Sequence, residues 1–302
     1  MRVSDQMVAA SIASRLSIAS ERLFRLQEQA GSGLAFQRPS QDPAAALRAA
    51  ALRSNVAEAE CYRRNAEEAA GQLKLAEAGL TAISRHLQEA RSAALGATDV
   101  SQAGNLALAD QVHQIALQIT REMNQTTGGR YLFAGYQVLT PPVVANPAGV
   151  PPYLYQGDYG EAQVQLGRGL TVTVNLTAAH ILNLDQVADP GAEDVLEALR
   201  CLEKALRSDD REGVTEALRS LERHAHRVLG LRGELGARVR HVEQIRSRLD
   251  EAKAAFQALL SQAQDADLTE VVIALRSQEI TYQAATVAAA ALHRASLLDY
   301  LR

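Results

Sequence analysis

The sequence predicts a mainly α-helical protein with a small β-rich insert. Hydrophobic residues make up 47% of the 302 residues, whereas aromatic residues make up only 4%. Long stretches place alanine and leucine at alternating spacings of three and four, which is typical of helices that pack along a narrow seam. The middle of the chain instead shows the period-two alternation of β-strands. These patterns predict a terminal helical coiled coil, a long-helix rod domain and a small outer β domain.

The N-terminal segment carries the first heptad pattern. Ile12, Leu16, Leu23 and Leu26 fall on one side of a helix, and the other sides hold Ser, Arg, Glu and Gln. Gly31-Ser32-Gly33 predicts the end of this helix, because glycine tolerates the left-handed conformation of a C-cap. We therefore expect these four apolar residues to form an N-terminal assembly seam.

A second, long helix is predicted over residues 44–95. Asp42 can cap its start, and Pro43 suits its first turn, where a missing N–H costs nothing. Only Gly71 and Gly79 interrupt the helical pattern. A turn is then expected over residues 96–104.

A third helix is predicted to end at Gly128-Gly129, where the character of the sequence changes. Residues 130–190 hold six of the eight prolines. Apolar and polar residues alternate on both sides of a turn at Gly167-Arg168-Gly169, which predicts a β-hairpin. Because a lone hairpin is marginally stable, we expect short strands near residues 131–137 and 153–156 to complete one small β unit.

Helical patterns return after Asp189-Pro190. A break is expected over residues 208–213, followed by a helix over about residues 214–264. Gly230, Gly233 and Gly236 lie inside this helix, and each weakens it by about 1 kcal/mol relative to alanine. Close packing against a neighbouring helix, or a kink, would explain them.

The C-terminal segment repeats the heptad pattern of the N-terminal segment. Its predicted assembly seam consists of Leu268, Val271, Leu275, Leu292, Leu297 and Leu298. A chain that folds back on itself would pair the two ends. Because two such thin seams bury little area, we expect the ends to become ordered only on assembly. The predicted division is 1–40 plus 265–302 for the coiled coil, 41–137 plus 190–264 for the rod and 138–189 for the β domain.

Composition and charge exclude several functions. The net charge is −4 and the isoelectric point is about 6.0, so no positive field favours nucleic acid or an anionic membrane. No stretch resembles a membrane span or a signal peptide. The chain is therefore expected in the cytoplasm, or outside the cell after export by a route that ignores such signals.

No catalytic, cofactor or metal site is predicted. His224 and His226 lie two residues apart in helical sequence and point in divergent directions, so they cannot easily share a metal ion. Cys61 and Cys201 are too few for a metal cage and do not make a disulfide framework. The sequence has no phosphate loop and no nucleophile elbow. An enzyme is not expected.

Several motifs together resemble the bacterial flagellin family. Leu23, Leu26, Gln29 and residues 31–33 and 39–44 are similar to its N-terminal block. Residues 235–238 and 265–267 are similar to its C-terminal helices. Residues 130–135 and the ending at 296–302 resemble the branch of the family that lies at the junction of hook and filament.

This resemblance implies a structural component of the bacterial flagellum, located outside the cell at the hook–filament junction and exported without a cleaved signal peptide. Its implied partners are copies of itself, the neighbouring hook-associated protein and flagellin, and a flagellar export chaperone. Neither nucleic acid nor membrane is an implied partner. Two alternatives are a filament flagellin and, in another class, a cytoplasmic coiled-coil scaffold.

Overall fold

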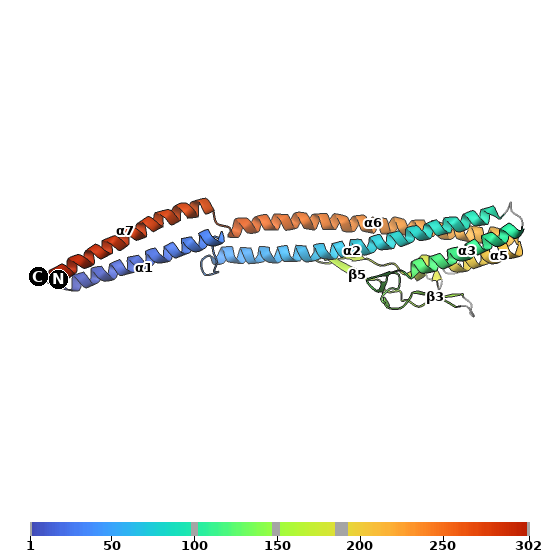
Figure 1. Cartoon of the computed structure of the whole chain (residues 1–302), viewed down its shortest axis with the longest axis horizontal. Coiled ribbons are helices and arrows are strands. Elements are labelled where there is room, and N and C mark those ends of the chain that lie inside the picture. The colour runs from blue at the N-terminus through green and yellow to red at the C-terminus, as the bar shows by residue number, and fades with distance from the viewer. Residues whose placement is uncertain (1, 98–101, 147–151, 185–192, 301–302) are drawn as a thin grey trace. The chain divides into compact units, whose positions relative to one another are not determined.

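The computed structural model describes the backbone of residues 2–97, 102–146, 152–184 and 193–300. The described elements, in chain order, are α1 (Arg2–Ser32), α2 (Pro43–Gly96), α3 (Gln102–Met123), β1 (Thr126–Thr127), β2 (Arg130–Tyr131), β3 (Val143–Ala145), β4 (Tyr153–Tyr155), β5 (Gln163–Gly167), β6 (Leu170–Thr173), α4 (Ala178–Leu182), α5 (Val195–Ser208), α6 (Arg211–Gln264) and α7 (Leu268–Tyr300) (Figure 1). The predicted fold class, mainly α with a small β insert, is confirmed.

The chain divides into two compact units. The terminal unit comprises residues 1–59 and 251–302, and the central unit comprises residues 60–250. The boundaries fall inside α2 and α6, so each of these long helices contributes to both units. The finer division into a coiled coil, a rod and an outer β domain stays a prediction.

Local sequence explains where the second long helix begins. The Asp42 carboxylate accepts a hydrogen bond from the Ala45 N–H at 2.9 Å, and Pro43 occupies the first helical position. This is the cap-and-proline start expected from the sequence. Asp194 caps α5 in the same way, with its carboxylate accepting from the Glu197 N–H at 2.7 Å. The expected start at Asp189-Pro190 lies outside the described residues.

The third helix is shorter than its apolar pattern suggested. It ends at Met123, and Gly128-Gly129 forms the turn between β1 and β2 with φ angles of 59° and 78°. Two consecutive positive φ angles match the twist of a tight hairpin, which is why a Gly-Gly pair serves here as a strand turn and not as a helix end. The expected turn over residues 96–104 is also shorter, because α3 already begins at Gln102.

The described strands form three separate two-stranded sheets. The strands expected near residues 131–137 and 153–156 are present as β2 and β4, but they do not join the β5–β6 hairpin in one sheet. The β5–β6 hairpin itself is confirmed, with Gly167 paired to Leu170 across the turn. The sheets are tied to helices instead of to one another. The Asn124 side chain, just after α3, donates to and accepts from the Val143 backbone, and the Asn65 amide of α2 donates to the Gln165 carbonyl.

The central unit has a substantial apolar core. Buried side chains from α2, α3, α5 and α6 pack together with residues of the β segments. Figure 1 shows α3 beside α5, and α2 beside α6. Ion pairs between Lys74 and Glu243 (2.7 Å) and between Arg91 and Glu222 (3.0 Å) join α2 to α6. The hydrogen bond from Lys74 lowers the pKa of the Glu243 carboxyl. Both pairs are exposed, so the buried apolar contacts contribute more to this packing than the ion pairs do.

Phe133 anchors the segment after α3 to the long helix. Its side chain is fully buried, and its ring lies against Gly79 of α2, where an added Cβ would approach the ring to 2.8 Å. Its carbonyl accepts a hydrogen bond from the Ala178 N–H at 2.9 Å, which joins the segment to the start of α4. The motif at residues 130–135 therefore includes the residue that joins the β segments to the helices.

Two of the three glycines in α6 do not pack closely within the chain. A Cβ added at Gly230 or Gly233 would meet no other atom within 4 Å, and both residues are exposed. The interpretation that they allow close packing against another helix of the same chain is therefore wrong for this pair. The helix continues through both positions.

A matched pair of glycine substitutions in α2 tests the role of Phe133. Gly79→Ala should destabilise the chain by about 1–3 kcal/mol, because the fully buried Phe133 ring would have to shift to make room for the new methyl group. Gly71→Ala, in the same helix with open space around it, should stabilise the chain by about 0.5–1 kcal/mol. Urea unfolding followed by circular dichroism measures both, and equal stability of the two variants would contradict this packing.

The buried carboxyl of Asp194 should make the stability of the chain depend on pH. Burial, opposed by the backbone hydrogen bond from Glu197, raises the pKa of its carboxyl to about 6. A raised pKa means that the folded state binds the proton more tightly than the unfolded state. The resulting stabilisation is complete below the unfolded pKa of 3.8 and is lost as the pH rises through about 6.

Asp194→Asn keeps the capping oxygen and removes the charge. The variant should therefore exceed the parent chain in stability by about 2 kcal/mol at about pH 7.5, and the difference should shrink towards about pH 4. Asp194→Ala, which removes the cap, should be less stable than the Asn variant by about 1 kcal/mol at both pH values. Thermal unfolding at a series of pH values measures these differences. A parent chain more stable than the Asn variant at neutral pH would refute the assignment.

Candidate assembly surface

Helices α1 and α7 pair side by side and antiparallel within the terminal unit (Figure 1). The segment that follows α1 also pairs with the segment that precedes α7. The Ala35 N–H donates to the Gln264 carbonyl and the Ala266 N–H donates to the Gly33 carbonyl, each at 2.8 Å. These bonds flank an antiparallel bridge between Leu34 and Asp265. The two segments therefore hold the start of α7 against the end of α1.

One polar side chain inside the pair fixes the alignment of the two helices. The Gln278 amide of α7 donates a hydrogen bond to the Ala19 carbonyl of α1 at 3.1 Å. A single polar residue in an otherwise apolar seam sets register at some cost in stability.

The structure places the four predicted residues of the N-terminal seam on one side of α1. Ile12, Leu16, Leu23 and Leu26 are all half-buried. In contrast, Phe24, in the same helix, is 66% exposed. The side of α1 that carries the four residues is thus the more covered one, although none of them is fully buried.

The predicted C-terminal seam is described only in part. Val271 is buried and Leu275 is half-buried, whereas Leu268, in the first turn of α7, is 51% exposed. The backbone of α7 continues through Leu292, Leu297 and Leu298, but their side chains lie outside the described part of the chain.

The side of α7 away from this seam carries apolar residues that the sequence analysis missed. Ile273, Ile280 and Val287 are 66%, 68% and 70% exposed. They are seven residues apart, so they line up along one side of the helix, roughly opposite Val271 and Leu275. We call these three residues the outer row. Its signal was present in the sequence as a second heptad register, on the side of the helix opposite the predicted seam.

The terminal unit has few other buried apolar residues. In its described part, the buried apolar side chains are Ala45, Ala49, Ala59 and Val271. Small side chains of this kind bury little area, so the α1–α7 pair gains little free energy from its own packing. Large apolar side chains also remain exposed on α1, among them Met7 and Ile18.

No group of three or more His, Cys, Asp or Glu side chains among the described residues could hold a metal ion. His224 is buried and the nearby His226 is exposed. Cys61 and Cys201 are free thiols. No helix in the described residues has both the length and the hydropathy needed to cross a membrane.

Comparison with known proteins agrees with this architecture. Residues 3–138 match the family described as the bacterial flagellin N-terminal helical region. Flagellar hook-associated protein 3 of Salmonella typhimurium is 25% identical, and that of Escherichia coli is 24% identical. Each alignment covers 94% of this chain and 94% of the relative.

A solved structure shares the fold. The structure of a putative flagellar hook-associated protein from Vibrio parahaemolyticus superposes with a TM-score of 0.67 at 20% sequence identity. The match covers 74% of this chain and all of the other. The resemblance inferred from the sequence motifs is therefore confirmed: residues 3–138 match the bacterial flagellin N-terminal helical region, and 94% of the chain aligns with flagellar hook-associated protein 3.

Proposed function

We propose that this chain is a structural subunit of the bacterial flagellum that joins the hook to the filament, and that α1 and α7 assemble it with neighbouring subunits. The observation that carries the proposal is the outer row of α7. Three large β-branched side chains stand exposed at heptad spacing on a helix whose other side already packs against α1. A row of this kind suits a further helix packed alongside.

The energetics support assembly through these helices. Complete burial of a Val or Ile side chain contributes about 1.5–3 kcal/mol relative to its exposed state. The outer row therefore offers several kcal/mol to any packing that covers it. The α1–α7 pair alone buries few large side chains, so a neighbouring subunit would supply much of the stability of the terminal helices. The predicted seam residues would then hold the pair together while the outer row contacts the neighbour.

The central unit differs from the terminal helices because it has an apolar core of its own. It buries large apolar side chains, including Leu73, Leu80, Ile119 and Phe133, within its own core. A unit with such a core does not need a neighbour in order to fold. We propose that it acts as the preformed part of the subunit, while the terminal helices complete their packing on assembly.

The names of the relatives support a location at the flagellum. Because those proteins are flagellar hook-associated proteins, we propose that this chain acts outside the cell at the hook–filament junction. Its partners would be copies of itself, the adjoining hook-associated protein and flagellin, and an export chaperone before assembly. Free cysteines are compatible with export as an unfolded chain. We propose no catalytic role.

Deletion of the gene tests the proposed role. We expect cells that complete their hooks, lack attached filaments and release flagellin into the medium. Re-expression of the full chain should restore attached filaments. Attached filaments of normal length in the deletion strain would refute the junction role. Loss of flagellin from both the filament and the medium would identify the chain as the filament subunit instead.

A pair of neighbouring substitutions tests the outer row. Ile280→Asp places a charge where we propose that a neighbouring subunit packs, so filament attachment should fall at least tenfold, equivalent to about 1.4 kcal/mol or more. Thr281→Asp is the control, because Thr281 is exposed but lies off the outer row. Both variants should be secreted and should show the same helical content as the parent chain. Equal attachment by the two variants would contradict the proposal.

A further inference from the structure

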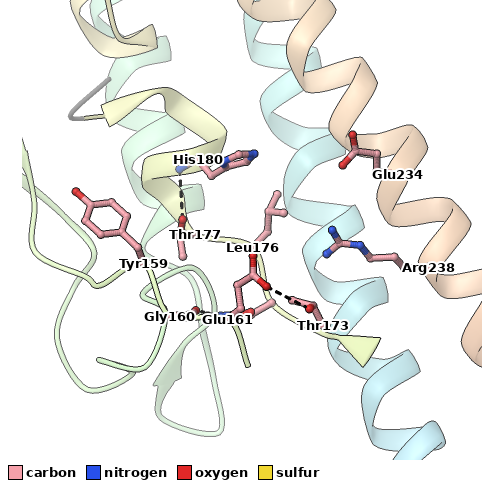
Figure 2. A pocket seen from close by; sticks show the side chains of 10 residues that line it. Tyr159, Gly160, Glu161, Thr173, Leu176, Thr177, His180, Glu234 and Arg238 are labelled. Carbon is pink, nitrogen blue, oxygen red and sulfur yellow. Dashed lines mark hydrogen bonds between the residues drawn. The ribbon is translucent and has the colours of Figure 1, made fainter. Parts of the chain in front are cut away.

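A pocket of about 230 Å³ lies in the central unit, between α6 and the segments around β5, β6 and α4 (Figure 2). Glu234 and Arg238 enter it from α6, His180 enters from α4, and Glu161 enters from the segment before β5. Its volume is below the range of pockets for drug-sized ligands, which begins at about 300 Å³. The pocket therefore suits one small molecule.

Two polar side chains that line the pocket already have hydrogen-bond partners within the fold. The Asn175 side chain accepts from the Ala162 N–H and donates to the Gly160 carbonyl, both at 2.8 Å. The Thr177 hydroxyl accepts from the His180 N–H at 3.3 Å. These bonds give the pocket a defined polar wall without using the charged side chains at its opening.

The charged side chains at the opening are largely unused. Within the part of the chain that the structure describes, the side chains of His180, Glu234 and Arg238 make no hydrogen bond or ion pair. The Glu161 carboxylate accepts one long bond, from the Thr173 hydroxyl at 3.5 Å. Elsewhere on α6, Glu222 and Glu243 are paired with cations.

Donors and acceptors alternate around the opening. Figure 2 shows His180, Glu234, Arg238 and Glu161 in that order around it. Arg238 can only donate hydrogen bonds and the two carboxylates accept them, while the imidazole can donate as well. A singly charged ligand would pair with some of these groups and repel the others. A zwitterion would satisfy one acid and one base and leave the other pair unused.

A polyhydroxylated ligand can use all four groups, because each hydroxyl both donates and accepts. Tyr159 and Leu176 add apolar lining, against which the C–H face of a sugar ring can pack. We propose that this pocket binds a neutral polyhydroxylated molecule of the size of one sugar ring. Arg238 would donate to its hydroxyls, and Glu161 and Glu234 would accept from them.

Saturation-transfer NMR on the full chain tests this site, with D-glucose and D-galactose as probes. We expect at least one of these sugars to receive saturation from the protein with a dissociation constant in the millimolar range. Arg238→Ala and Glu161→Gln should each weaken binding about tenfold, because each removes a charge-assisted hydrogen bond. Arg240→Ala is the matched control, since Arg240 is an exposed arginine of the same helix that does not line the pocket, and it should leave binding unchanged.

Three further probes separate the ligand classes: glycine as a zwitterion, acetate as an anion and methylammonium as a cation. Absence of transfer to both sugars, or tighter binding of any of the three charged probes, would overturn the proposal. Sugar binding that is equally strong in Arg238→Ala and Arg240→Ala would also overturn it. If the alanine variant unfolds, Arg238→Gln provides a second test, and it should also weaken binding.

Discussion

The packing of α1 against α7 is the constraint on which the terminal unit depends. Each helix turns a narrow apolar side towards the other, and the Gln278 amide and the bridge between Leu34 and Asp265 fix their alignment. This pairing occupies one side of each helix and leaves Ile273 and Ile280 exposed on α7. The same pairing that joins α1 to α7 therefore also leaves exposed the surface that we propose for contact with a neighbouring subunit.

The two units differ in how much of their stability is internal. The central unit buries large side chains from several helices and ties its β segments to them through Phe133 and Asn124. The described part of the terminal unit buries mainly alanine. A protein that must assemble with neighbours can use this contrast, because one unit is folded in advance while the other gains stability on contact.

Much of the helical architecture could be predicted from the sequence, because heptads, caps and prolines act locally. The start of α2 at Pro43 and the turn of the β5–β6 hairpin are two examples. Features that depend on distant residues could not be predicted. The close contact between Gly79 and Phe133 joins residues far apart in the chain, and the pocket residues Glu161 and Arg238 come from different elements. Ile280 was missed because it belongs to a second apolar register, on the side of α7 opposite the seam that packs against α1.

Hydrogen–deuterium exchange of free and assembled subunits would test the central claim most directly. Backbone amides of residues 2–32 and 268–290 should exchange quickly in the free monomer and become protected on assembly. Amides of the central helices, such as those around Leu80 in α2, should be protected in both states. Strong protection of both terminal helices in the free monomer, with no change on assembly, would contradict the account.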